Sequence, residues 1–143
     1  MKNMIKRFKN ERGITLVELL AVVVILAILG TIAFVLIGNV IENSKKDAHI
    51  ANAQQLISAA KLYEADGGEL GSISAEQLES QGFLEPLISP WDDFNYNEEE
   101  ANVTKSEGKY SVKLDGKDCN INTDEETVLS GERDDICSSG NED

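Results

Sequence analysis

A run of uncharged, mostly apolar residues near the N-terminus limits what this chain can fold into. Residues 19–37 contain no charged side chain, and only Gly30 and Thr31 interrupt their apolar character. As an α-helix the run is about 30 Å long at roughly 1.5 Å per residue, which matches the hydrocarbon core of a bilayer. A buried helix of a soluble domain is rarely so long and so uniformly apolar. The run therefore predicts a membrane-spanning helix.

The residues on either side of this run predict its orientation in the membrane and whether it is cleaved from the mature protein. The first twelve residues hold five Lys or Arg and one Glu. Because basic residues stay on the cytoplasmic side, we expect the N-terminus in the cytoplasm and the rest of the chain outside. A cleaved secretory signal peptide is the alternative, but its apolar core is normally about 7–15 residues and ends at a small-x-small site. Residues 36–39 offer no such site, so we expect the segment to stay in the mature protein.

Glu18 lies directly before the uncharged run. A charge at the centre of a membrane helix costs roughly 2.5–3.5 kcal/mol, and less near a helix end. Such a residue normally has a function and a partner. The simpler interpretation is a carboxylate that rests at the level of the lipid headgroups.

Chain length and charge limit the size of the folded head and the classes of function that it can have. Of 143 residues, roughly 100 follow the apolar run, which is enough for one small folded head. The net charge is −13, and everything after Gly13 is strongly acidic. Nucleic-acid binding through a general basic surface is therefore excluded, and we expect no direct nucleic-acid partner. The sequence also contains no nucleophile–base pair, phosphate loop or metal constellation, so no enzymatic activity is expected.

One long helix is expected over residues 14–65, which contain no proline. From residue 42 onward the helix becomes amphipathic, with apolar residues at three- and four-residue spacing. Gly67 can adopt the left-handed conformation that ends a helix. The apolar stripe consists of Ile50, Ala53, Ile57 and Ala60, flanked by Leu56 and Tyr63.

Shorter elements should follow the long helix. Ser74 and Gln77 form a capping-box pattern that predicts a short helix. Two prolines make residues 83–91 an irregular connection, whose Trp91 we expect in the core. Glu107-Gly108 predicts a hairpin turn, next to a short strand at Val103 and an alternating strand over residues 110–114. A third strand is expected at Cys119 and Ile121. The predicted fold class is therefore α+β, a long N-terminal helix packed on a small antiparallel sheet.

The two cysteines, Cys119 and Cys137, both lie in the head. An oxidising exterior favours a disulfide between them over two free thiols. It would close a loop of about 19 residues, worth roughly 3 kcal/mol in the chain-entropy model. Two thiols and one histidine, His49, are too few for a zinc site.

The sequence Gly13-Ile14-Thr15-Leu16-Val17-Glu18 resembles the prepilin signature of type IV pilins and type II secretion pseudopilins. That signature has a short basic leader, a glycine, a cleaved bond before a hydrophobic residue, and a glutamate fifth in the mature chain. All of these are present here in the right order. The apolar helix, its amphipathic continuation and the small β-rich head are also similar to that family. Residues 68–91 resemble the Gram-positive competence pilins, in which a short helix follows the long one.

The resemblance implies a structural subunit rather than an enzyme. A prepilin peptidase would cut after Gly13 and N-methylate the new terminus at Ile14. Glu18 would then pair with the terminal amine of a neighbouring subunit in a filament assembled by pilus machinery from many copies. In a dry bundle a misplaced subunit leaves an unpaired charge, so the pair would set register more than it adds stability. The implied divisions are a leader at residues 1–13, a membrane and assembly helix at 14–40, and an extracellular head at 41–143.

Several alternatives stay open on the sequence alone. The subunit could serve competence, motility or adhesion, or act as a pseudopilin of a type II secretion-like system. A single-pass anchored binding protein that never polymerises explains the apolar run and acidic head, but not the spacing of Gly13 and Glu18. Many related pilins carry a proline in the first helix, which leaves open whether the helix melts near Gly30 or Gly38 on assembly.

A calcium site is the alternative to a head without cofactors. Some pseudopilin heads bind Ca²⁺ through acidic loops, and carboxylates are suitable ligands. Runs of acidic residues more often form solvated surfaces, and no EF-hand spacing is present, so no metal site is expected. The candidate ligands are Asp124, Glu125, Glu126, Asp134 and Asp135.

Overall fold

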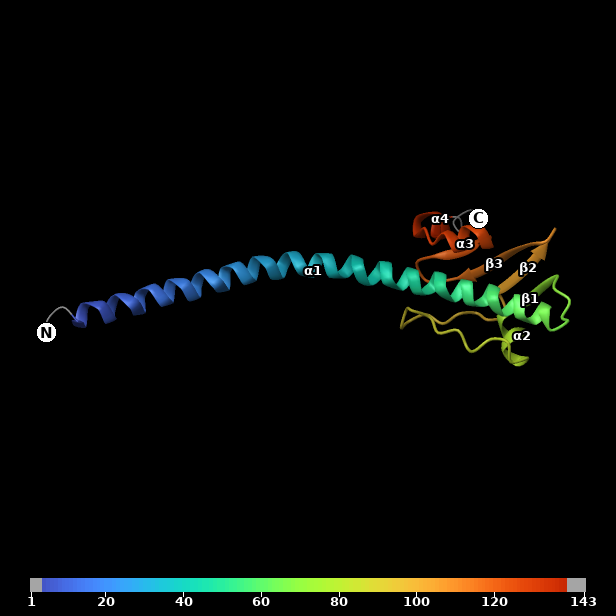
Figure 1. Cartoon of the computed structure of the whole chain (residues 1–143), viewed down its shortest axis with the longest axis horizontal. Helices are drawn as coiled ribbons and strands as arrows, with labels where there is room; N and C mark the ends of the chain where they lie inside the picture. The colour runs from blue at the N-terminus through green and yellow to red at the C-terminus, as the bar shows by residue number, and fades with distance from the viewer. Residues whose placement is uncertain (1–3, 139–143) are drawn as a thin grey trace. The chain divides into compact units, whose positions relative to one another are not determined.

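The computed structural model describes the backbone of residues 4–138 and the side chains of residues 15–137. The chain divides into two compact units, Met1–Ile41 and Glu42–Asp143, here called the stem and the head. Helix α1 contributes to both units. The elements, shown in Figure 1, are α1 (Met4–Ala65), β1 (Ser72–Ser74), α2 (Ala75–Ser80), β2 (Asn102–Ser106), β3 (Lys109–Asp115), β4 (Asn120–Asp124), α3 (Glu125–Ser130) and α4 (Arg133–Ser138).

Helix α1 confirms the expected long helix and its C-terminal stop. It begins at Met4, ten residues before the expected start at Ile14, because the basic segment is also helical. It ends at Ala65, where Gly67 adopts a φ of +99°. The N–H of Gly68 donates to the carbonyl of Tyr63 over 3.0 Å. A side chain at Gly67 would strain this left-handed conformation, which explains why glycine ends the helix.

The head contains a four-stranded antiparallel sheet in the order β1-β2-β3-β4. The β2–β3 hairpin turns at Glu107 and Gly108, whose φ values of 52° and 81° match the mirror-image turn that the twist of a hairpin favours. The register places Val103 opposite Val112 and Leu114 opposite Ile121. All four side chains are buried, so one face of the sheet forms part of the core.

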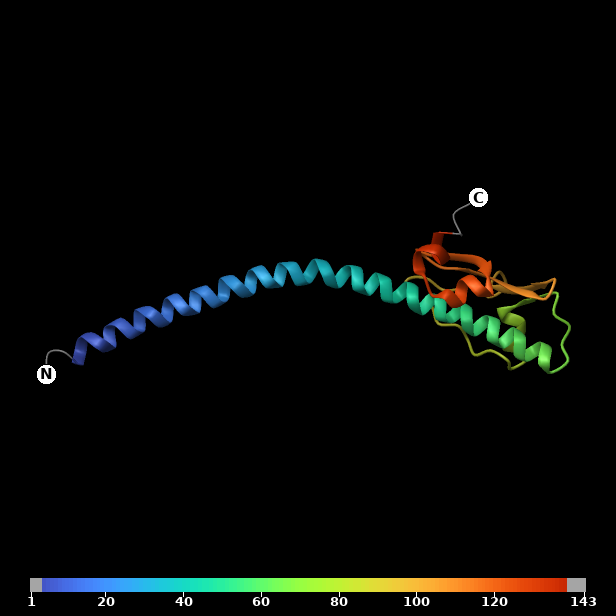
Figure 2. The same cartoon turned by 45° about the horizontal axis from the view of Figure 1, so that its top comes forward.

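The apolar stripe of α1 supplies the other half of the core. Ala53, Leu56 and Ala60 are completely buried, and Ile50 and Ile57 nearly so. Figures 1 and 2 show the part of α1 in the head running along the sheet. Trp91, from the irregular connection, is 2% exposed and belongs to the same cluster, as the sequence predicts. The α+β fold class is therefore confirmed.

Three details of the head differ from expectation. Cys119 precedes β4 instead of lying in it. Strand β1 was not predicted, because its three residues are too few to show an alternation of apolar and polar side chains. The acidic segment after β4 forms helices α3 and α4. Asp124 caps α3 by accepting a hydrogen bond from the Thr127 N–H over 2.9 Å.

Candidate functional site

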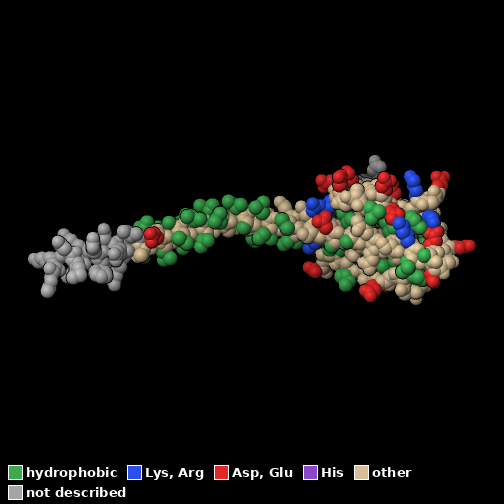
Figure 3. Space-filling model, viewed as in Figure 1, with side chains coloured by type: hydrophobic (Ala, Val, Ile, Leu, Met, Phe, Trp, Pro, Cys, Tyr) green, Lys and Arg blue, Asp and Glu red, His purple; other side chains and the backbone are tan. Residues whose placement is uncertain are grey.

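The stem presents apolar side chains over its surface. Among the described stem residues, every large hydrophobic side chain from Leu16 to Ile41 is at least half exposed. Figure 3 shows hydrophobic side chains covering this segment, whereas Lys, Arg, Asp and Glu side chains gather on the head. A surface of this kind is stable only when lipid or other apolar side chains cover it. By length and composition, the segment Thr15–Ala65 of α1 could cross a membrane.

Glu18 is the acidic residue of this apolar surface. It lies in α1 with its side chain exposed. Ile14 precedes it by four residues, which is about 6 Å along the helix axis and places both on the same helix face. The side chain of Ile14 lies outside the described residues, although the backbone of Gly13 and Ile14 belongs to α1. A positive charge created on the nitrogen of Ile14 would therefore lie near the carboxylate.

The bond between Gly13 and Ile14 is part of the helical backbone. A protease that cuts an extended strand of substrate would first have to unwind α1 locally. Glycine is about 0.8–1.0 kcal/mol less favourable than alanine in a helix, so its position is suited to unwinding. Its lack of a side chain also permits close approach of an enzyme to the backbone. Cleavage at Gly13 and methylation of Ile14 stay predictions.

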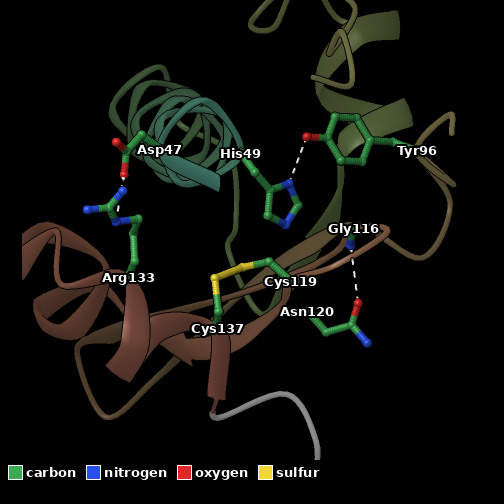
Figure 4. Close-up of a disulfide and its surroundings, with 8 residues drawn as sticks. All are labelled: Asp47, His49, Tyr96, Gly116, Cys119, Asn120, Arg133 and Cys137. Carbon is green, nitrogen blue, oxygen red and sulfur yellow. Dashed lines mark hydrogen bonds and ion pairs between the residues drawn. A yellow bond between two sulfur atoms is a disulfide. The ribbon is translucent and has the colours of Figure 1, made fainter. Parts of the chain in front are cut away.

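The two cysteines are joined. Cys119, which precedes β4, forms a disulfide with Cys137 of α4, and their Cα atoms are 4.7 Å apart (Figure 4). The bond closes the segment that contains β4, α3 and α4. Arg133 of α4 also pairs with Asp47 of α1 over 3.4 Å. Two separate links therefore fix the C-terminal helices within the head.

A second polar cluster connects α1 to the hairpin. Glu64 accepts hydrogen bonds from the ammonium of Lys105 and the hydroxyl of Tyr110. These bonds, foremost the one from Lys105, hold the pKa of Glu64 below its usual 4.5. Lys61 lies over the ring of Tyr110, 4.9 Å from its centroid, and pairs with Glu125. The cluster is on the surface, where such pairs position elements more than they stabilise them.

The candidate calcium ligands do not form a common cage. Asp124 is used as the cap of α3, and Glu125 is paired with Lys61. Within residues 15–137, no group of three His, Cys, Asp or Glu side chains is placed to hold a metal ion. Asp124 and Glu125 therefore already serve as a helix cap and as an ion-pair partner within the head.

Sequence reasoning missed a buried polar cluster in the head. His49 is fully buried, and its Nδ1 lies 2.7 Å from the hydroxyl of Tyr96. His49 precedes Ala53 by four residues, so the apolar stripe of α1 could have predicted that His49 lies on the buried face of the helix. Tyr96 is 47 residues away, and no local pattern connects the two.

Comparison with protein families identifies one segment of the chain. A model of the prokaryotic N-terminal methylation motif matches residues 8–34. These residues include Gly13, Ile14, Glu18 and much of the apolar run. Comparisons with curated proteins and with solved structures gave no match. The matched motif supports the type IV pilin and pseudopilin family, and it points to a structural protein.

Proposed function

We propose that this chain is a pilin subunit that is processed after Gly13 and polymerised through α1 into a type IV pilus-like filament. The observation that carries the proposal is the methylation motif at residues 8–34 on the stem part of α1, where every described large hydrophobic side chain is at least half exposed. The motif implies a prepilin peptidase and other pilin subunits as partners. The exposed stem then needs two successive environments, the membrane before assembly and neighbouring stems after it.

Physical chemistry favours this order of events. Lipid tails are as apolar as Leu or Val, so moving the stem from lipid into a bundle gains little from hydrophobicity. Helix packing and polar pairing therefore decide whether subunits associate. Cleavage would create an amine at Ile14, and Glu18 would offer its carboxylate to the amine of a neighbour. Since an unpaired charge in the bundle is costly, only one axial position of the incoming subunit satisfies both groups.

The proposed topology follows from the charges beside the stem. The basic leader would remain in the cytoplasm, and the acidic head would lie outside the membrane. After removal of the leader the mature chain would carry a charge of about −17, which disfavours direct DNA binding through long-range repulsion. The precursor would be a single-pass membrane protein, and the mature subunit part of an extracellular filament.

Cysteine crosslinking distinguishes a filament from a lone membrane anchor. The chain has only two cysteines, and both are in the disulfide, so single cysteines introduced over residues 19–35 meet no competing thiol. A filament should give crosslinks that recur with a helical period, together with ladders of higher oligomers. Matched cysteines at the exposed head positions Ser58 and Glu69 show the background from collisions. Crosslinks that are absent or without period in piliated cells would favour an anchored protein that does not polymerise.

A further inference from the structure

A buried histidine lies beneath a long irregular segment of the head. Residues 81–101, here called the aromatic loop, connect α2 to β2 without a helix or strand of their own. The ring of His49 stacks on Tyr96 of this loop, with centroids 5.5 Å apart, and meets Trp91 edge-on at 5.2 Å. The side chain of His49 has no exposed surface. The loop is therefore held on α1 partly by an ionisable group that water does not reach.

Hydrogen bonding fixes the protonation state of this histidine. The amide nitrogen of Asn52 donates to the carbonyl of Ile88 over 2.9 Å, which identifies it as a donor. The same nitrogen lies 3.0 Å from the hydroxyl oxygen of Tyr96, which must therefore accept. The hydroxyl hydrogen of Tyr96 is left to donate to Nδ1 of His49 over 2.7 Å. His49 is thus neutral in the closed loop, with its hydrogen on Nε2.

The other side of the ring is tightly packed. A side chain at Gly116 would come within 2.9 Å of Cε1 of His49 and 2.8 Å of the Trp91 ring, so only glycine fits there. Figure 4 shows His49 between Tyr96 and the β3–β4 turn that contains Gly116. Within the described residues, Nε2 of His49 is buried without a hydrogen-bond partner. A positive charge on this ring would therefore be poorly compensated.

Titratable groups act on His49 from the aromatic loop and from the β3–β4 side. On the aromatic loop the titratable group in contact is Tyr96. On the β3–β4 side Asp115 favours the protonated ring, as do the carbonyls of Leu114 and Cys119, but burial outweighs them and lowers the pKa of His49 from 6.5 to about 4. The elements packed around the ring also carry the ion pairs Asp47–Arg133, Asp93–Lys117 and Lys113–Asp115.

We propose that His49 is an acid-sensitive latch that holds the aromatic loop on α1 and releases it on protonation. A proton from solvent binds Nδ1, which then becomes a donor. The oxygen of Tyr96 would face two donors, from His49 and Asn52, and its own hydrogen would lose its acceptor. Lifting the loop lets water reach the imidazolium and the phenol while the sheet stays intact. The latch does not depend on the proposed function of the stem.

The direction of the pH effect follows from proton linkage. The open loop exposes a histidine with an ordinary pKa of 6.5, whereas the closed loop holds one at about 4. Between these values the open form binds more protons, so acidification favours opening. Full stabilisation of the closed loop is present above pH 6.5 and is lost as the pH falls toward 4. At pH 5 the equilibrium constant for opening should be about 20-fold higher than at neutral pH.

Trp91 reports the state of the loop, because it is the only tryptophan of the chain and is 2% exposed. We would measure acrylamide quenching of its fluorescence, with far-ultraviolet circular dichroism, on the full chain in detergent micelles from about pH 7.5 to pH 4.5. Quenching and a red shift should appear as the pH falls below 6.5, while the helix and sheet signals persist. In His49→Gln, which cannot take up the proton, the transition should be absent.

Three results would overturn the latch. The first is an identical acid transition in wild type and His49→Gln. The second is loss of the circular dichroism signal at the same pH as the fluorescence change, which is global unfolding. The third comes from Tyr96→Phe, which removes the hydroxyl shared by His49 and Asn52. This variant tests the latch independently if His49→Gln does not fold. We expect its Trp91 to be more quenched than wild type at neutral pH with native circular dichroism, and equal quenching would contradict the proposal.

Discussion

Cys137 of α4 is bonded to Cys119, the residue before β4, across a separation of 18 residues. Cys119 is buried and Cys137 is only partly covered, so a reductant can reach the bond. Reduction should lower the free energy of unfolding of the head by roughly 3 kcal/mol, since the open loop gains entropy in the unfolded state. Urea titrations followed by Trp91 fluorescence, with and without dithiothreitol, measure this change.

A Cys119→Ser/Cys137→Ser variant is the matched control for that experiment. It should show the lowered urea midpoint at the outset and no response to the reductant. If reduction of the wild-type chain leaves the midpoint unchanged, the disulfide does not stabilise the head.

The contact of Glu64 with Lys105 and Tyr110 predicts acid sensitivity of the head. The pKa of Glu64 is lowered in the folded state, so below pH 4.5 the unfolded state binds more protons. The stabilisation is therefore present above pH 4.5 and is lost as the pH falls through the lowered folded value. Replacing Glu64→Gln should flatten the fall of the urea midpoint in this range.

Glu69→Gln, at an exposed loop position, serves as the comparison for Glu64. It should leave the pH dependence of the midpoint like that of wild type. Parallel curves for wild type and Glu64→Gln would show that the cluster has no net effect on folding.

Glu18→Ala should separate processing from assembly. The peptidase motif around Gly13 is untouched, so the variant should still lose its leader. Without the carboxylate, an incoming subunit has no partner for its terminal amine, and incorporation into filaments should fall strongly. Immunoblots of sheared filaments and of membrane fractions measure the ratio of assembled to unassembled subunit, with Glu69→Gln as the control. Normal piliation by Glu18→Ala would refute the role of Glu18 in setting register.

Much of the fold could be predicted because its signals are local. The stripe from Ile50 to Ala60, the capping box at Ser74 and the turn at Gly108 each depend on neighbours within a few residues, and the structure contains all three. The cap of α3 was also local, since Asp124 bonds the N–H three residues later, but the surrounding acidic residues made the segment look like a solvated loop.

The parts that could not be predicted depend on distant contacts. His49 meets Tyr96 only because the aromatic loop folds back on α1, and the Asn52 amide reaches the Ile88 carbonyl for the same reason. Strand β1 is three residues long and exists because β2 pairs with it. For the candidate site the reverse holds, because Gly13, Ile14 and Glu18 form a contiguous motif that needs no tertiary structure to be recognised.

The mass of the mature N-terminus tests the central claim most directly. Intact-protein and peptide mass spectrometry of sheared filaments and membranes should find a chain that begins at Ile14 with one added methyl group. Gly13→Val should block this cleavage, whereas Gly38→Ala, at a helix position with open space around it, should not. A chain that retains Met1 and the leader, in cells with an active prepilin peptidase, would contradict the account.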